Sequence, residues 1–296
     1  MLKKIPGNLE IMTGTIKNAI EKFKKKVKNV VFKIALRTPL NSYRFFFILI
    51  VITLWTIYRN RATIGNIARY KKAINNSQLN IIFIFNCFMG ESYSRIFPHL
   101  LAENPGRYMK YVCIEGKDYV RRLIDKDTGV ILISGHFGPM FRSLLFKEAF
   151  GKDVSSFAST DYKNKVCNAS AKLYKISSSF PYYAVGEEKQ FQDGLLRKEW
   201  INFLNDVPVK KRDSNNHTLF GKNIYLSELP FKVAIKYNIP ILFVGVTRNK
   251  RQYTVSILPI DEFKTPKEGL GKYIALLTQL ICNDPYASIY IADNHF

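Results

Sequence analysis

The chain has 296 residues, of which 47% are hydrophobic, and a formal net charge of +22. This apolar content excludes a disordered protein and is enough for one large or two small domains with a substantial core. Residues 1–75 carry 16 Lys and Arg against two acids, so 16 − 2 = +14 of the charge lies in the first quarter. A basic segment of this kind indicates a membrane surface or nucleic acid as partner.

The first predicted element is a basic amphipathic helix. Between Ile16 and Ile34 apolar residues recur at spacings of three and four, and lysines fill the other faces. This period is typical of a helix with one apolar stripe. Three interpretations stay open, namely a helix lying in a membrane interface, a helix packed on the rest of the protein, and an arm that binds nucleic acid.

The second predicted element is an uncharged apolar helix over the fourteen residues 45–58, which Arg44 and Arg59 flank. At about 1.5 Å per residue it reaches about 21 Å, short of a hydrocarbon core of about 30 Å. It therefore inserts into one leaflet, spans with help from flanking turns, or is a core helix of a soluble domain. Because this run begins too late for a secretory signal, we expect the bulk of the chain to stay in the cytoplasm.

From residue 76 onward the pattern predicts an α/β domain over 76–296, preceded by a membrane-association segment over 1–75. Strands alternate with helices, which indicates a mixed, mainly parallel sheet with helices on both faces. The predicted strands are 111–114, 130–134, 154–158, 182–185, 200–205, 241–247 and 253–258, with a hairpin turn at 248–251. The predicted helices are 117–124, 140–150, 164–174, 187–198, 228–237 and 267–282. Residues 207–223 show no period and are predicted to form a functional or mobile loop.

The cysteines and most histidines carry no recognisable chemistry. Cys87, Cys113, Cys167 and Cys282 lie far apart without a CxxC pair, so we predict reduced thiols and no metal site. His217 and His295 are interpreted as incidental.

His136 is different, because an apolar strand delivers it into the turn Gly135-His136-Phe137-Gly138 ahead of a helix. Such turns display reacting side chains in α/β folds, although a structural histidine is the alternative. No acid follows within the next eleven residues.

Several segments occur in an order similar to that of a known family. Gly129 to Gly138 comes first, a strand ending at Asp206 follows, and Leu219-Phe220-Gly221 then leads into residues 226–247. Residues 112–116 add an upstream match. This series resembles the bacterial lipid A biosynthesis acyltransferases, the lauroyl and myristoyl transferases, within the glycerolipid-acyltransferase-like fold. The resemblance covers about residues 40–260.

The resemblance implies transfer of a fatty acyl chain to a hydroxyl of a membrane lipid or lipid-linked sugar. The donor would be a thioester of acyl carrier protein or coenzyme A, with no metal or other cofactor, at the cytoplasmic face of the inner membrane. His136 would be the general base that activates the hydroxyl. Candidates for oxyanion stabilisation or substrate binding are Gly135, Gly138, Arg142, Phe220 and Gly221.

One departure from the family is clear. The family's carboxylate five residues after the histidine is replaced here by Phe141. Asp206 is the first candidate to take over its role, although a turn or helix-capping Asp is the alternative. Glu148 is weaker, because twelve helical residues carry it about 18 Å away.

Lys210-Lys211-Arg212 could meet phosphates or an acidic carrier, or form a solvated loop. The leading hypothesis is an active acyltransferase, the second a homologue without turnover that binds lipid or supports an assembly. A nucleic-acid-binding protein is disfavoured, because no nucleic-acid motif is present.

Overall fold

The structure is a computed structural model that describes residues 43–136, 142–158, 182–209, 216–249, 252–287, 291, 292 and 294. The chain divides into two compact units, Met1–Ile52 and Thr53–Phe296. Of the first unit only the start of one helix is described. The predicted elements at 16–34 and 164–174 lie outside the described residues, as do Cys167, His295 and the tip of the 248–251 turn. The second unit contains the sheet and the candidate site.

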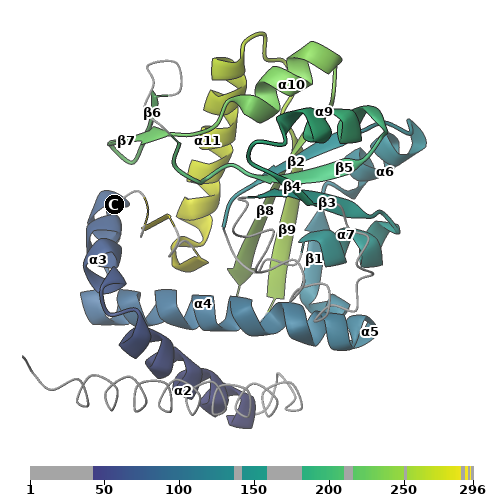
Figure 1. Cartoon of the computed structure of the whole chain (residues 1–296). Helices are drawn as coiled ribbons and strands as arrows, with labels where there is room; N and C mark the ends of the chain where they lie inside the picture. The colour runs from purple at the N-terminus through teal and green to yellow at the C-terminus, as the bar shows by residue number, and fades with distance from the viewer. Residues whose placement is uncertain are drawn as a thin grey trace, which may run out of the picture. The chain divides into compact units, whose positions relative to one another are not determined.

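A seven-stranded mixed sheet forms the second unit, with helices beside it (Figure 1). Every neighbouring pair of strands is parallel except β8 and β9, which form an antiparallel pair. The prediction of a mainly parallel α/β sheet with a hairpin near residue 250 is therefore confirmed. In sheet order the strands are β1 (Val112–Glu115), β9 (Gln252–Pro259), β8 (Ile241–Asn249), β2 (Val130–Ser134), β5 (Trp200–Leu204), β3 (Val154–Ala158) and β4 (Tyr182–Ala184).

The central strands β2 and β5 are mostly apolar because both of their faces are covered, with Ser134 and Asn202 as their buried polar residues. Every residue of β2 is buried, and Ile131 and Ile133 join Ile201 and Phe203 of β5 in the main core cluster. Side chains of α9 (Glu188–Leu196), α10 (Leu229–Tyr237) and α11 (Pro266–Asn283) belong to the same cluster. The next residues along the strand point the other way, where Trp200 lies 6.0 Å from Phe146 of α7, centroid to centroid. Burial on two faces explains why these strands consist mainly of apolar residues.

Most helices of the α/β unit begin and end close to their predicted bounds. The long helix α11 starts at a capping box, in which the Thr265 hydroxyl and the Glu268 carboxylate each accept from the other's backbone N–H. Among the described residues, the helices after β1 are α6 (Lys117–Asp125), α7 (Arg142–Phe150), α9 (Glu188–Leu196), α10 (Leu229–Tyr237) and α11 (Pro266–Asn283), followed by the short η3 (Pro285–Ala287).

Before the sheet, the structure contains helices that the sequence pattern did not reveal. The α2 helix (Tyr43–Arg59) was expected, but α3 (Thr63–Ala73) and the 24-residue α4 (Asn80–Glu103) were not. The short elements α5 (Pro105–Tyr108) and η1 (Met109–Tyr111) then lead into β1. Gly90 lies inside α4 because a Cβ there would come within 3.0 Å of the Tyr286 carbonyl oxygen.

In the described part of the chain, no helix alone has the length and apolar character needed to cross a bilayer. The pair α2 and α3, taken together across a bend of 102°, would meet that requirement by length and composition. The expected helix over 45–58 is thus present, and its relation to a membrane stays a prediction.

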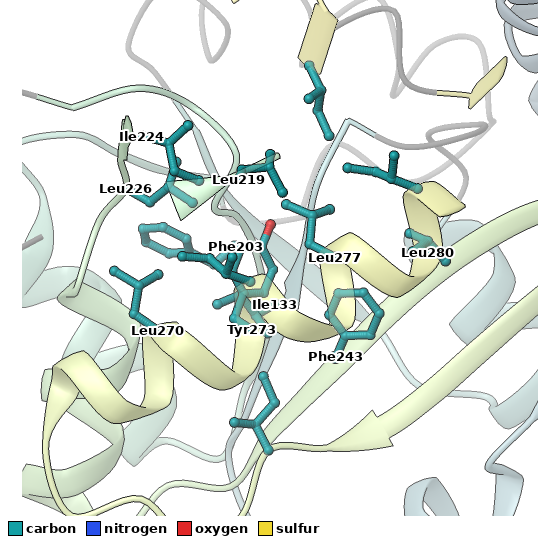
Figure 2. Packing of buried hydrophobic residues seen from close by; sticks show 14 of the residues in the cluster. Ile133, Phe203, Leu219, Ile224, Leu226, Phe243, Leu270, Tyr273, Leu277 and Leu280 are labelled. Carbon is teal, nitrogen blue, oxygen red and sulfur yellow. The ribbon is translucent and has the colours of Figure 1, made fainter. Parts of the chain in front are cut away.

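The prediction of an aperiodic loop over 207–223 was wrong for its second half. Residues 216–225 form an antiparallel hairpin of β6 (Asn216–Leu219) and β7 (Lys222–Tyr225). Phe220 and Gly221 make its two-residue turn with φ values of 47° and 75°, as a type I′ turn requires. Figure 2 shows Leu219 and Ile224 of this hairpin gathered with Tyr273 and Leu277 of α11 in the core.

The three described cysteines are free thiols, as predicted. Cys87 is buried, and burial raises the pKa of its thiol, so it stays protonated and unreactive. Cys113 and Cys282 are exposed.

Candidate functional site

The candidate site lies at the carboxyl ends of two adjacent parallel strands. Ser134 of β2 is in register with Leu204 of β5. Two residues further along each strand direction, the chain places His136 and Asp206. The pairing of β2 with β5 therefore brings together two side chains that are 70 residues apart in sequence. The carboxyl edge of a parallel sheet is where α/β folds place their ligands.

His136 and Asp206 form a doubly hydrogen-bonded pair. The Nδ1 atom of His136 lies 2.8 Å from Oδ1 of Asp206, and the backbone N–H of His136 donates to Oδ2 at 2.6 Å. The Asp206 side chain is 1% exposed, whereas that of His136 is 24% exposed. With its proton on Nδ1, the ring donates to the carboxylate and carries a lone pair on Nε2. One carboxylate thus fixes both the position and the tautomer of the ring.

Gly135 allows the carboxylate to come this close. A Cβ atom at this position would lie 3.0 Å from Oδ2 and 3.1 Å from Cγ of Asp206. Any side chain at residue 135 would push the carboxylate away from His136. The glycine is therefore required by a close approach and not by its backbone φ angle.

The end of β2 is held by polar contacts from β5, from the residue that follows β5, and from α11. The Ser134 carbonyl oxygen accepts from the Asn205 backbone N–H at 2.8 Å and from the Tyr273 hydroxyl at 3.2 Å. The Ser134 hydroxyl donates to Oδ1 of Asn202 at 2.8 Å. These contacts connect β2, β5 and α11 directly below the turn that carries His136.

Arg142 is buried against the same turn. Its side chain belongs to α7, the residue is 3% exposed, and Nη2 donates to the Gly135 carbonyl oxygen at 2.7 Å. A guanidinium in this place contributes a positive charge next to the pair of His136 and Asp206. The expectation that Arg142 stabilises an oxyanion or binds substrate stays a prediction, whereas its contact with the Gly135 carbonyl oxygen is present in the structure.

Tyr273 was missed in the sequence because it looks like an ordinary core residue of α11. It is completely buried, and burial raises its pKa far above the usual value. The charge of Asp206 raises that pKa further, and Arg142 lowers it. The hydroxyl therefore stays protonated and acts as a donor to Ser134. Only its place in the fold reveals this role, since the apolar stripe of a helix gives no sign of it.

The other predicted residues lie elsewhere or outside the described part. Phe220 and Gly221 occupy the hairpin turn, and their predicted role in substrate binding stays a prediction. Glu148 is exposed on α7, whereas Asp206 is the acid that reaches His136. Partial burial lowers the pKa of His217 on β6, which keeps this side chain neutral. Gly138, Phe141 and Lys210-Lys211-Arg212 lie outside the described residues.

A histidine held by a buried carboxylate, at the carboxyl edge of a mainly parallel sheet, is an arrangement suited to general-base chemistry. The family model of the bacterial lipid A biosynthesis acyltransferases matches residues 95–279, which is more than half of the chain and includes β2, β5 and most of α11. The chain belongs to this family, as the residue pattern predicted. A search of curated proteins found no match. Membership supports acyl transfer to a lipid or glycolipid as the class of reaction.

Proposed function

We propose that the protein is an acyltransferase that moves a fatty acyl chain from a thioester to a hydroxyl of a lipid or lipid-linked sugar. The donor in this proposal is acyl carrier protein or coenzyme A, acting as co-substrate. The observation that carries the proposal is the 2.8 Å contact between His136 and Asp206 inside the segment that matches the family.

In the proposed reaction His136 is the general base. A hydroxyl is a weak nucleophile at neutral pH, so Nε2 takes its proton as the oxygen attacks the thioester carbonyl carbon. The tetrahedral intermediate then collapses, the carbon–sulfur bond breaks, and the imidazolium returns the proton to the departing thiolate. Asp206 stabilises the imidazolium and keeps the ring in the tautomer that can accept a proton.

The replacement at position 141 does not leave His136 without an orienting acid. Asp206 contacts the Nδ1 atom from the next strand, which supports an active enzyme over a homologue without turnover. The same contact engages the backbone N–H of His136. Stabilisation of the oxyanion is therefore assigned to other donors of the turn, with the amides of Gly135 and Gly138 as candidates.

We also propose that α2 contacts the cytoplasmic face of the inner membrane. Phe47, Val51, Leu54 and Tyr58 follow one helical stripe and are 67%, 41%, 55% and 66% exposed. The buried residues of the same helix are Phe45, Leu49, Thr53 and Thr56, two of which carry hydroxyls. A helix that buries hydroxyls and exposes large apolar side chains is suited to a lipid environment.

The function is tested by release of free thiol from an acyl thioester in the presence of membrane lipids as acceptors. The protein is expected to release thiol and form acylated lipid, and His136→Ala is expected to lower the rate by about 10³-fold or more. A mutant that is as fast as the parent would contradict the assignment of the base. Tight lipid binding without transfer to any acceptor would favour the homologue without turnover.

The membrane proposal is tested by sedimentation with vesicles that contain anionic lipid. The double variant Phe47→Ser and Leu54→Ser is expected to bind at least about tenfold more weakly, since each lost side chain forfeits roughly 1.5 kcal/mol or more of apolar burial. Leu196→Ser with Ile235→Ser is the matched control, because these residues are 54% and 44% exposed on α9 and α10. Equal losses in both double variants would argue against a specific role of α2.

A further inference from the structure

We infer that the connection between α3 and α4 is a further interaction surface, and that its partner is a bilayer surface that carries anionic lipids. This surface, called the α3–α4 corner, consists of Lys71, Lys72, Leu79, Ile81 and Ile82. It lies in the unit that carries the sheet. Its contact with lipid is separate from the one proposed for α2 and does not depend on acyl transfer.

The first turn of α4 presents large aliphatic side chains to solvent. Leu79 is 69% exposed, Ile81 77% and Ile82 47%. Ile81 and Leu79 are the two most exposed large apolar side chains in the described part of the chain. The next residue, Phe83, is completely buried in the core. Adjacent exposed apolar side chains of this size mark a site of interaction with another surface.

The start of α4 is also poorly suited to water in its local structure. Leu79 occupies the N-cap position and forms no capping hydrogen bond, and the first turn holds no acidic residue. Ser, Thr, Asp and Asn are the residues that stabilise a helix at this position, and leucine is among the least favourable. The helix therefore lacks local stabilisation at this end. Burial of the same leucine in an apolar environment would offset that loss.

Basic residues flank this apolar turn, and acids are absent from the sequence around it. The chain has no Asp or Glu from residue 22 to residue 90, and residues 53–90 contain five Lys and Arg. Two of these are Lys71 and Lys72 in the last turn of α3, where Lys72 is exposed and Lys71 partly exposed. Aliphatic side chains beside lysines suit the interface of a bilayer with anionic lipids, which attracts basic residues close to its surface.

The backbone of the connection keeps the lysines close to the apolar turn. The N–H groups of Asn75 and Asn76 donate to the carbonyl oxygens of Lys72 and Lys71, each at 3.1 Å. Asn75 has a φ of 53°, and this left-handed conformation ends α3 sharply. Three chain steps then lead from Asn76 to Leu79, which span at most about 11 Å. The charged and the aliphatic side chains therefore belong to one small surface.

A bilayer fits the α3–α4 corner better than nucleic acid or a second copy of the chain. Proteins that bind single-stranded nucleic acid stack its bases on aromatic side chains, whereas the exposed apolar residues of the corner are aliphatic. A two-fold dimer would bring the same positive surface of two copies together, and like charges oppose that contact.

The test measures how tightly the full-length protein binds sedimenting vesicles. One set contains phosphatidylcholine alone, and the other contains equal amounts of phosphatidylcholine and phosphatidylglycerol. Leu79→Ser with Ile81→Ser is expected to weaken binding to the anionic vesicles by at least about tenfold, because two aliphatic side chains no longer enter the interface. Lys71→Gln with Lys72→Gln is expected to weaken the same binding by roughly tenfold and to leave binding to phosphatidylcholine unchanged.

The matched control is Val185→Ser with Leu196→Ser, since these residues are 62% and 54% exposed elsewhere in the same unit. The control is expected to bind vesicles like the parent. Parental binding by the Leu79 and Ile81 variant overturns the inference, as does an equal loss in the control. Equal losses of the lysine variant on both kinds of vesicle overturn the preference for anionic lipid.

Two further measurements identify the other partners. Sedimentation velocity without vesicles shows whether Leu79→Ser with Ile81→Ser converts a dimer to a monomer. Such a conversion with unchanged vesicle binding would assign the α3–α4 corner to a second copy. Loss of binding to a single-stranded oligonucleotide, again with unchanged vesicle binding, would assign it to nucleic acid. Either result overturns the inference.

Ile81→Trp reports directly on insertion and keeps the surface apolar. Its fluorescence is expected to move to shorter wavelength on anionic vesicles by more than that of the parent, whose two tryptophans are Trp55 and Trp200. Ile235→Trp on α10, at a residue that is 44% exposed, is expected to add no shift. Absence of an added shift in Ile81→Trp overturns the inference.

The α3–α4 corner can be tested apart from the other proposals. Phe47→Ser with Leu54→Ser, combined with Leu79→Ser and Ile81→Ser, is expected to multiply the separate losses in binding, because two independent contacts are removed. A combined loss no larger than that of the α2 variant alone overturns a separate contact. His136→Ala is expected to bind vesicles like the parent, so a failure of the proposed acyl transfer leaves this result unchanged.

Discussion

The body of strands β2 and β5 differs sharply from their carboxyl ends, although both regions are equally buried. In the body, residues such as Ile131, Ile133 and Ile201 are apolar and inaccessible to solvent. Toward the carboxyl ends the buried side chains become polar, from Asn202 in β5 to Ser134, Asn205 and Asp206. The same two strands thus change from core packing to hydrogen bonding within a few residues.

The buried polar groups at the carboxyl ends of β2 and β5 contribute less to stability than the apolar residues in the body of these strands. Buried apolar side chains contribute roughly 1.5–3 kcal/mol each, whereas a buried polar group is unfavourable unless it is hydrogen-bonded. Asp206 and Ser134 have such partners, but the side chain of Asn205 has no hydrogen-bond partner among the residues that the structure describes. Changes in the body should therefore affect folding, and changes at the carboxyl end should affect chemistry. The following predictions test that division.

The largest effect is expected for Asp206→Asn at the carboxyl end. An amide at this position no longer stabilises the imidazolium and favours the wrong tautomer of His136, so kcat should fall by about 10³-fold. The rate of thiol release measures this. Asp153→Asn is the matched control, because Asp153 is largely exposed and forms a surface ion pair with Lys147. A loss below tenfold in Asp206→Asn would show that the pair does not support catalysis.

An intermediate effect is expected for Ile133→Ala in the body of β2. Removal of this fully buried side chain leaves a cavity, and the free energy of unfolding should fall by about 3 kcal/mol. Urea unfolding measures the loss. Ile235→Ala on α10 is the control, since Ile235 is 44% exposed and its truncation should cost less than about 1 kcal/mol. If the folded Ile133→Ala protein also lost most of its kcat, the division between body and end would fail.

The smallest effect is expected for Gly221→Ala in the β6–β7 hairpin, away from both regions. The residue has a φ of 75°, so a Cβ costs about 1 kcal/mol even though no atom of the described residues lies within 4 Å of it. Gly65→Ala on α3 makes the same change at an open helical position and should stabilise by about 0.5 kcal/mol or more. Opposite shifts in Tm are thus expected. Shifts of the same sign would contradict the backbone argument.

Sequence reasoning succeeded where burial alone determines the pattern. Strands such as β2 and β5 are covered on two faces and read as apolar runs, so they could be recognised without a partner. His136 was recognised because it ends such a run before a helix. The family resemblance was confirmed on the same segments.

It failed where local rules are overridden by tertiary contacts. The α4 helix contains Gly90 and Pro98, which normally indicate a break, but its packing in the fold keeps it continuous. The β6–β7 hairpin was hidden because Phe220 adopts a positive φ that usually requires Gly or Asn. Its contribution to the core, through Leu219 and Ile224, becomes visible only once α11 lies beside it.

The sequence could suggest a partner for His136, but the contact itself depends on the fold. Nothing local connects residue 136 with residue 206, since the pairing of β2 with β5 alone makes them neighbours. Tyr273 and the inward position of Arg142 were likewise invisible, because both depend on how helices from distant parts of the chain meet the strand ends.

Because Asp206 approaches Gly135 closely, the residue type at each of these two positions restricts the residue type at the other. When an acid at position 206 is hydrogen-bonded to His136, residue 135 must be glycine. Any larger residue at 135 would displace that acid. In a comparison of many relatives, the two positions should therefore vary together, with Gly135 retained wherever the acid comes from the neighbouring strand.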